Sequence, residues 1–353
     1  MGKYYNQLNR EVKEYFKILS ADFPEWLEDY IDTKEMQRIN KISYNCGTNY
    51  SKLFDIKFWY SNLDHSVAVA LIMWHFTNDK KETIAGLLHD IATPAFKHCI
   101  DFMNKDSEKQ ESTEEKTRDI IENSKEIRDL LVRDNIKLED VIDYKIYPLA
   151  DNDTPRLAAD RFEYYFSCGL NFKRIWELDE IKRVYENIVI VKNEDGVDEL
   201  AFKDKNVCEE YIKKVSKLWQ EWISDKDRTL MQFIADMCKS LNKINHLTVE
   251  DLYKLSEEEI IERIKSSKDN YLKKAWQNFN NCTKAYKSDC LVEDKYCINV
   301  TTKTKYVNPL VLHNGAPKRI YDISTTARKT IDKFLNMPKG GYYTYFDFDF
   351  KPY

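Results

Sequence analysis

The stretch NLDHSVAVALIMWHFTNDKKETIAGLLHDIATPAFKHCID, residues 62–101, contains four of the six histidines in this 353-residue chain. Apolar residues recur at helical spacing on both sides of a polar turn, which predicts two helices over residues 63–76 and 80–92. A short connection makes such helices antiparallel neighbours. His65 and His89 are therefore expected to meet across the helix pair.

The dipeptide His89-Asp90 ends the second of these helices. Adjacent helical residues project about 100° apart, so both can touch one ion only from a helix end or a distorted turn. Pro94 breaks the helix just downstream and meets that requirement. Imidazole and carboxylate ligands suit a divalent transition metal, namely Fe, Mn, Ni, Co or Zn, with Mg as a further option.

A fourth ligand is expected from a helix further along the chain. Thr154 and Pro155 have the residue types of an N-cap and a first helical residue, which predicts a helix from residue 156 to about 166. This helix carries Asp160, the leading candidate for the fourth ligand. Asp151 and Asp153, in the polar loop before it, are rivals.

The rest of the pattern predicts a mainly α-helical chain. A capping box predicts one long helix over residues 112–133, and the chain from 172 to 265 is also largely helical in pattern. Alternating β-branched residues predict one or two strands within 297–312. We therefore expect a helical domain over residues 1–267 and a small α+β extension over 268–353.

Composition limits the classes of partner and compartment. The net charge is −5 and both signs are interspersed, so nucleic acid is not indicated as a partner. No apolar run approaches the length of a membrane span, and the N-terminus lacks the apolar segment of a signal peptide. The eight cysteines form no C-x-x-C pair, which favours reduced thiols. A cytoplasmic protein without a membrane partner is expected.

The ordered set His65, His89-Asp90 and Asp160 resembles the HD-domain metal-dependent phosphohydrolases. HDIATPAFKHCID, residues 89–101, resembles the His-Asp-x-x-x-x-x-Phe-x-His-x-x-Asp stretch of their deoxynucleoside triphosphate triphosphohydrolase branch. PRLAADRFEYYF, residues 155–166, resembles that branch's helix with Asp, a basic residue and then Tyr. The resemblance covers roughly residues 60–170 and implies an HD-domain helical bundle with a small β-containing C-terminal subdomain.

Carried over position by position, the resemblance implies a set of site residues. The metal ligands are His65, His89, Asp90 and Asp160. His98 and Asp101 take catalytic or phosphate-contacting positions. Arg161 occupies the basic position beside the last ligand, where it can pair with a phosphate oxygen. Tyr164, one turn after Asp160, is expected to contact phosphate or sugar.

Three positions depart from the pattern of this branch. Asn62 stands where an Arg often precedes the first His, and Thr93 stands where a second His commonly follows the dipeptide. Glu114 takes the place of a further active-site His, and either Glu114 or His98 is a candidate to protonate the leaving group. Fewer cations favour a smaller or less charged substrate than a full triphosphate.

The leading hypothesis for function is metal-dependent hydrolysis of a phosphate ester or anhydride of a nucleotide, with a deoxynucleoside triphosphate or monophosphate as first choice. A divalent ion would activate the attacking water. The alternatives are a phosphodiesterase acting on a cyclic or linear oligonucleotide, and a catalytically weak sensor that binds metal or nucleotide. The resemblance also implies a homo-oligomer.

Overall fold

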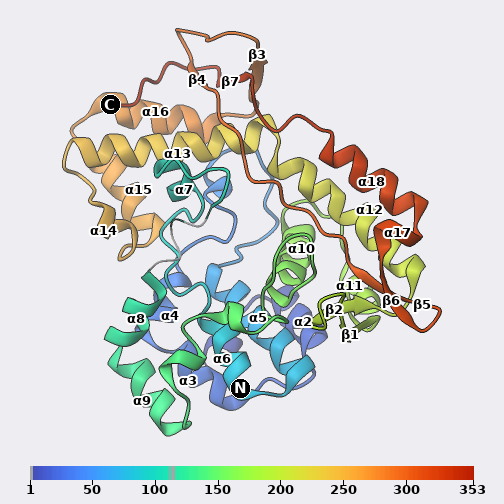
Figure 1. The fold of residues 1–353 in the computed structure, drawn as a ribbon. Helices are drawn as coiled ribbons and strands as arrows, with labels where there is room; N and C mark the ends of the chain where they lie inside the picture. Colours follow the sequence, from blue (N-terminus) through green and yellow to red (C-terminus); the bar gives the residue numbers. More distant parts are fainter. Residues whose placement is uncertain (1–2, 111, 113–115) are drawn as a thin grey trace.

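The computed structural model describes residues 3–110, 112 and 116–353. The chain is mainly α-helical, with two small sheets formed largely by its C-terminal part (Figure 1). This confirms the expected fold class. Within the described ranges, none of the helices combines the length and hydrophobicity that crossing a bilayer would require.

Two antiparallel helices lie at the centre of the site region, as the sequence predicts. Helix α5, Asn62–Thr77, begins with a capping box between Ser61 and Asp64, and it ends where Asn78 adopts a left-handed conformation with φ 49°. Helix α6, Lys80–Leu88, follows directly, with Asp79 as its N-cap. The whole first three turns of α5 are buried, so its position in the fold is fixed on all sides.

N-terminal and middle helices surround this pair. These are α1 Lys3–Gln7, α2 Arg10–Leu19, α3 Glu25–Ile31, α4 Lys34–Ile39, α8 Thr117–Asn123, α9 Lys125–Arg133 and α11 Leu178–Tyr185. The single long helix expected over 112–133 is wrong, because α8 and α9 are separate helices that meet at Ser124. Ser124 has an extended backbone, and its hydroxyl accepts a hydrogen bond from Ile127 N, so it caps a new helix instead of continuing the first.

Helix α10, Ala159–Asn171, packs against α5 and starts later than expected. The expected helix start at Pro155 is wrong, since the Thr154-Pro155 bond is cis and the next residues form a loop. The loop amides find partners outside any helix: Leu157 N donates to the Glu199 carboxylate at 3.2 Å. The shift leaves Asp160 in the first turn of α10.

The core consists of two hydrophobic clusters. The first is built around α5, α6, α10 and α12, Lys205–Trp222. The second is built around α13, Asp225–Lys243, on which α7, Cys99–Met103, packs. Three further helices, α14 Val249–Leu252, α15 Glu257–Ser266 and α16 Asn270–Asn281, belong to the second cluster.

A β-hairpin interrupts the region expected to be helical. Strands β1, Ile188–Lys192, and β2, Asp198–Phe202, pair in antiparallel register around a turn in which Gly196 takes φ 74°. The β-branched run IVIV in β1 explains the strand. The sheet continues in the order β1-β2-β5-β6, with β5, Leu310–His313, parallel to β2. Strand β6 is Ala316–Arg319.

The C-terminal part returns across both clusters. Its second sheet has the order β3-β7-β4, formed by Tyr286–Ser288, Tyr343–Phe346 and Tyr296–Ile298. Helices α17, Ile320–Ile323, and α18, Thr325–Leu335, pack on α12. Residues 299–309 connect β4 to β5 and are named the crossing segment (Figure 1). The division at residue 267 stays a prediction.

Candidate metal centre and active site

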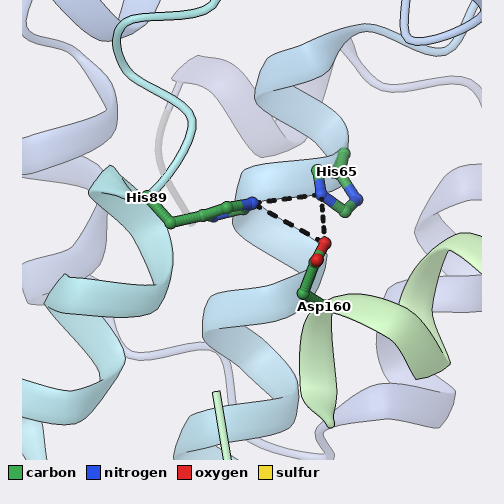
Figure 2. A group of neighbouring side chains, drawn as sticks. All are labelled: His65, His89 and Asp160. Atoms are coloured by element: carbon green, nitrogen blue, oxygen red, sulfur yellow. Dashed lines mark hydrogen bonds and ion pairs between the residues drawn. The ribbon is translucent and has the colours of Figure 1, made fainter. Parts of the chain in front are cut away.

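Three side chains from three helices converge on one point (Figure 2). His65 comes from α5, His89 from the end of α6, and Asp160 from the first turn of α10. His65 Nε2 lies 3.2 Å from His89 Nε2 and 3.1 Å from Asp160 Oδ1, and His89 Nε2 lies 3.8 Å from the same oxygen. Such separations allow one ion to contact all three atoms.

The other ring nitrogen of each histidine fixes which atom faces the centre. His65 Nδ1 donates to the buried carboxylate of Glu163, and His89 Nδ1 donates to the Gly86 carbonyl at 2.7 Å. Both Nε2 lone pairs then point at the centre, beside a carboxylate oxygen. A proton or a metal ion between these three atoms removes their mutual repulsion, and the donor set of two imidazoles and a carboxylate fits a divalent metal.

The electrostatics of the cluster favour positive charge. Burial lowers the pKa of His65, but the charge of Glu163 and the contact with Asp160 outweigh this and raise it to about 9. Burial likewise raises the pKa of Asp160, but the two histidines outweigh this and lower it to about 2. The site therefore holds its carboxylates ionised in a buried position and stabilises a cation next to them.

Asp90 lies at the edge of this cluster. Its carboxylate oxygens are 4.0 Å from His65 Nε2 and 3.7 Å from His89 Nε2. Burial opposes ionisation, yet the charges of Lys97 and the two histidines hold the pKa of Asp90 well below its usual range. Lys97 Nζ lies 3.1 Å from Asp90 Oδ2. Asp90 thus lies next to the three-residue cluster, and its part as a fourth ligand stays a prediction.

The rival ligands of the preceding loop have other contacts. Asp151 Oδ1 accepts from Arg161 Nη2 at 2.9 Å. Asp151 and Asp153 both line a cavity next to the metal cluster, but neither belongs to the cluster of His65, His89 and Asp160. The described geometry therefore favours Asp160 over these two as the ligand from this region.

The cluster lies at the wall of a cavity of about 840 Å³. Its volume is within the range of small-molecule sites. The residues that line it come from both hydrophobic clusters and from the crossing segment. Those used below are Lys97, His98, Arg161, Tyr164, Asp227 and Lys305.

His98 and Asp101 form a pair beside the metal cluster. His98 Nδ1 lies 2.9 Å from Asp101 Oδ2, and Asp101 Oδ1 accepts from Ser112 Oγ at 2.7 Å. Asp101 is fully buried, so it orients His98 and stays away from the cavity. Burial, aided by the charge of Lys305, lowers the pKa of His98 to about 4, which keeps it neutral at neutral pH. Glu114 lies outside the described residues.

Arg161 and Tyr164 both line the cavity. The guanidinium of Arg161 donates to Asp151 and to the backbone and side chain of Asn152, so it secures the loop before α10. The ring of Tyr164 packs edge-on against Trp222 at 5.4 Å. Their expected contacts with a substrate stay predictions.

The comparisons with known proteins agree with this geometry. Residues 62–150 match the family model described as HD domain. Over this range the chain is similar to an HD domain. The matched range begins with α5 and holds the first two ligands, together with Asp90 and the residues 96–101.

Two curated relatives each match a little under half of the chain. A protein named Uncharacterized protein YdhJ, from Bacillus subtilis, is 27% identical over 165 residues, which are 46% of this chain and 49% of the relative. A protein named Metal-dependent phosphohydrolase cns2, from Cordyceps militaris, is 23% identical over 163 residues, or 46% of this chain and 45% of the relative. The match thus spans about half the length of each relative.

Solved structures extend the likeness of fold to nearly the whole chain. A hypothetical protein from Aquifex aeolicus superposes with a TM-score of 0.63 at 14% identity and covers 92% of this chain and 93% of its own. A phosphohydrolase from Bacteroides thetaiotaomicron gives the same TM-score and identity, with 92% and 96% covered. At this identity the likeness concerns the fold.

Several residues of the HD-domain site were not predicted. Glu163 orients His65, and its spacing of three residues from Asp160 on the same helix was an available clue. Lys97, next to His98, reaches Asp90 and the side chain of Asn62. It places a cation beside Asn62, the position where the related branch often has Arg. Lys305 had no local clue, because its place depends on how the crossing segment folds back.

Proposed function

We propose that this chain is a metal-dependent phosphohydrolase that hydrolyses a phosphate ester or anhydride of a nucleotide. The observation that carries the proposal is the pair of Nε2 lone pairs, fixed by Glu163 and the Gly86 carbonyl, which face Asp160 at the wall of a large cavity. The match of residues 62–150 to the HD-domain model and the name of the fungal relative support the reaction class.

In this proposal His65, His89, Asp90 and Asp160 hold the ion. When bound, a divalent metal lowers the pKa of water and offsets charge on a phosphoryl group. Because Asp101 accepts from His98 Nδ1, the Nε2 of His98 can accept a hydrogen bond from water or a substrate hydroxyl and orient it. Lys97 lies beside Asp90, where its charge favours binding of a phosphate.

The proposal predicts that the ligands are needed for both metal and turnover. The test uses the purified chain reconstituted with Mn, Mg, Co, Ni or Fe. The substrates are deoxynucleotides, ribonucleotides, monophosphates and cyclic dinucleotides, and products are resolved by ion-exchange chromatography. His89→Ala and Asp90→Ala should lose bound metal and turnover by more than the roughly 10- to 100-fold typical for residues behind the ligands.

His246→Ala is the matched control, since this histidine is exposed and lies outside the site. It should keep wild-type metal content and rate. Turnover that persists in metal-free protein would contradict the proposal. A bound ion with no product from any substrate would also overturn it and favour a sensor. Inorganic triphosphate, orthophosphate or a nucleoside monophosphate as product would identify which bond is cleaved.

A further inference from the structure

The crossing segment places Lys305 in the wall of the catalytic cavity, together with Lys303. Backbone contacts fix the segment there. Lys303 N donates to the Ser107 carbonyl at 3.1 Å, Ser107 Oγ donates to the Thr301 carbonyl at 2.8 Å, and Asn308 N donates to the Pro155 carbonyl at 2.7 Å. These contacts join it to both the loop after α7 and the loop before α10.

Lys305 is a partly buried cation without a counterion. Among the described residues, no carboxylate lies within ion-pairing distance of its ammonium group, and the group makes no hydrogen bond there. Burial, with the like charges of Lys303 and Lys97, lowers its pKa to about 8. An unpaired, partly desolvated ammonium group is costly, and an anion entering the cavity relieves that cost.

The acidic groups that face Lys305 are already occupied or uncharged. Asp101 is engaged by His98 and Ser112. Asp227 lines the same cavity, but its pKa is raised to about 8 by burial and by the charge of Glu221, so it keeps its proton at neutral pH. Among the residues that the structure describes, the Lys305 ammonium group at this end of the cavity therefore has no direct ionised partner, and Asp101, the carboxylate whose charge reaches it, already accepts hydrogen bonds from two other side chains.

The charges also have an order along the cavity. Lys97 contacts the ligand-side carboxylate Asp90. The charges of Lys97 and Lys305 both lower the pKa of their shared neighbour His98. Positive charge thus extends from the metal centre, through Lys97, to Lys305. A phosphate held at the metal would leave Lys305 available for a further anionic group of the same molecule.

We propose that Lys305, carried in by the crossing segment, binds an anionic group of the substrate that is not the reacting phosphate. Such a group is a second phosphate of a diphosphate or triphosphate chain. The inference rests on the proposed function and deepens it. The charge of Lys305 also offsets the missing cations at Asn62 and Thr93. Without Lys305, those two positions favour a less charged substrate.

The experiment is isothermal titration calorimetry of the full chain with pyrophosphate and with orthophosphate, in metal-free and Mn-reconstituted forms. Lys305→Met should weaken pyrophosphate binding about tenfold or more in both forms, the usual effect of losing a charge-assisted hydrogen bond. Orthophosphate should be affected less. Lys305→Arg should retain most of the affinity, and Lys318→Met, at an exposed position of β6, should match wild type.

Pyrophosphate affinity that is unchanged in a folded Lys305→Met variant would overturn the inference. So would a wild-type chain that binds no pyrophosphate in either form. If Met at position 305 prevents folding, Lys305→Gln keeps a polar side chain there and carries the same expectation. If no substrate is hydrolysed but Lys305→Met still weakens pyrophosphate binding, the proposed reaction is wrong and the anion subsite stands. If a substrate is hydrolysed but Lys305→Met leaves pyrophosphate binding unchanged, the subsite is wrong and the proposed reaction stands.

Discussion

At the residue scale, buried ionisable side chains are the feature that most distinguishes this site. Asp227 is 6% exposed, and no described side chain forms a hydrogen bond or ion pair with its carboxyl group. Burial and the charge of Glu221 raise its pKa to about 8, against the partial opposition of Lys305 and Lys226. The native state therefore retains a proton that the unfolded chain releases near pH 4.

This difference predicts the sign of a pH effect on stability. Between about pH 4 and pH 8 the native state binds more protons than the unfolded state, so the contribution of Asp227 to the free energy of unfolding falls as pH rises, by at most about 1.4 kcal/mol per pH unit. Asp227→Asn removes this term. The difference in free energy of unfolding between Asp227→Asn and wild type, measured by urea unfolding, should increase in favour of the variant from pH 5 to pH 8.

The exposed Asp349→Asn is the matched control and should give a difference from wild type that does not change with pH. A pH-independent difference for Asp227→Asn as well would show that the carboxyl is ionised in the native state. The cavity would then contain a negative charge near Lys305, which would weaken the case for an anion at that end.

At the element scale, the α5–α6 pair sets the distance between the two histidines. Gly86 faces α5 closely: a Cβ at this position would lie 3.2 Å from Met73 Cγ and 3.5 Å from Val69 Cγ1. Gly86→Val should therefore push the helices apart and cost about 1–3 kcal/mol of unfolding free energy. It should also weaken metal binding, because the 3.2 Å separation of the Nε2 atoms depends on this approach.

The control for this prediction is Lys81→Val, at an exposed position of the same helix. It introduces the same β-branched residue and should cost less than about 0.7 kcal/mol. Calorimetric metal titration and urea unfolding measure the two effects. A Gly86→Val variant that loses stability but keeps full metal affinity would show that the loop after α6, and not the helix spacing, positions His89.

The element scale also explains what the sequence could predict. The helices that carry His65 and His89 are rich in buried apolar residues and are separated by a clear polar turn, so the local sequence was enough to predict them. The β1–β2 hairpin was missed because its strands are short and lie between long helices. The helix break at Ser124 and the loop before Asp160 were not predicted, because hydrogen bonds decide the local conformation there. Ile127 N donates to the Ser124 hydroxyl, and Leu157 N donates to the distant Glu199 carboxylate.

At the scale of the whole molecule, the catalytic cavity is shared between distant parts of the chain. The proposed metal ligands lie on or at the ends of α5, α6 and α10, which contribute to the first hydrophobic cluster, whereas Asp227 and Met231 come from α13 of the second. The crossing segment contributes Lys303 and Lys305. Motifs locate the metal ligands because these lie in local patterns. They cannot locate the lysines, since their position depends on a chain return of more than 200 residues after the HD dipeptide.

This sharing predicts that a change far from the metal can alter the cavity. A Cβ at Gly340 would lie 2.5 Å from Thr301 Oγ1, 2.9 Å from Thr301 Cα and 3.0 Å from the Val300 carbonyl oxygen. Backbone atoms cannot move aside as a side chain does, so Gly340→Ala should displace the crossing segment. Pyrophosphate affinity should fall while metal affinity stays at the wild-type value, and the free energy of unfolding should drop by about 1–3 kcal/mol.

Gly341→Ala separates this steric effect from backbone strain. Its Cβ would meet no atom within 4 Å, but its φ of 80° is unfavourable for alanine. It should cost about 1–2 kcal/mol of stability and leave both affinities unchanged. If Gly340→Ala lowers metal and pyrophosphate affinity equally, the crossing segment supports the HD centre as a whole. If it lowers pyrophosphate affinity alone, the C-terminal part acts on the cavity through the anion it binds, and the metal centre depends only on its three helices.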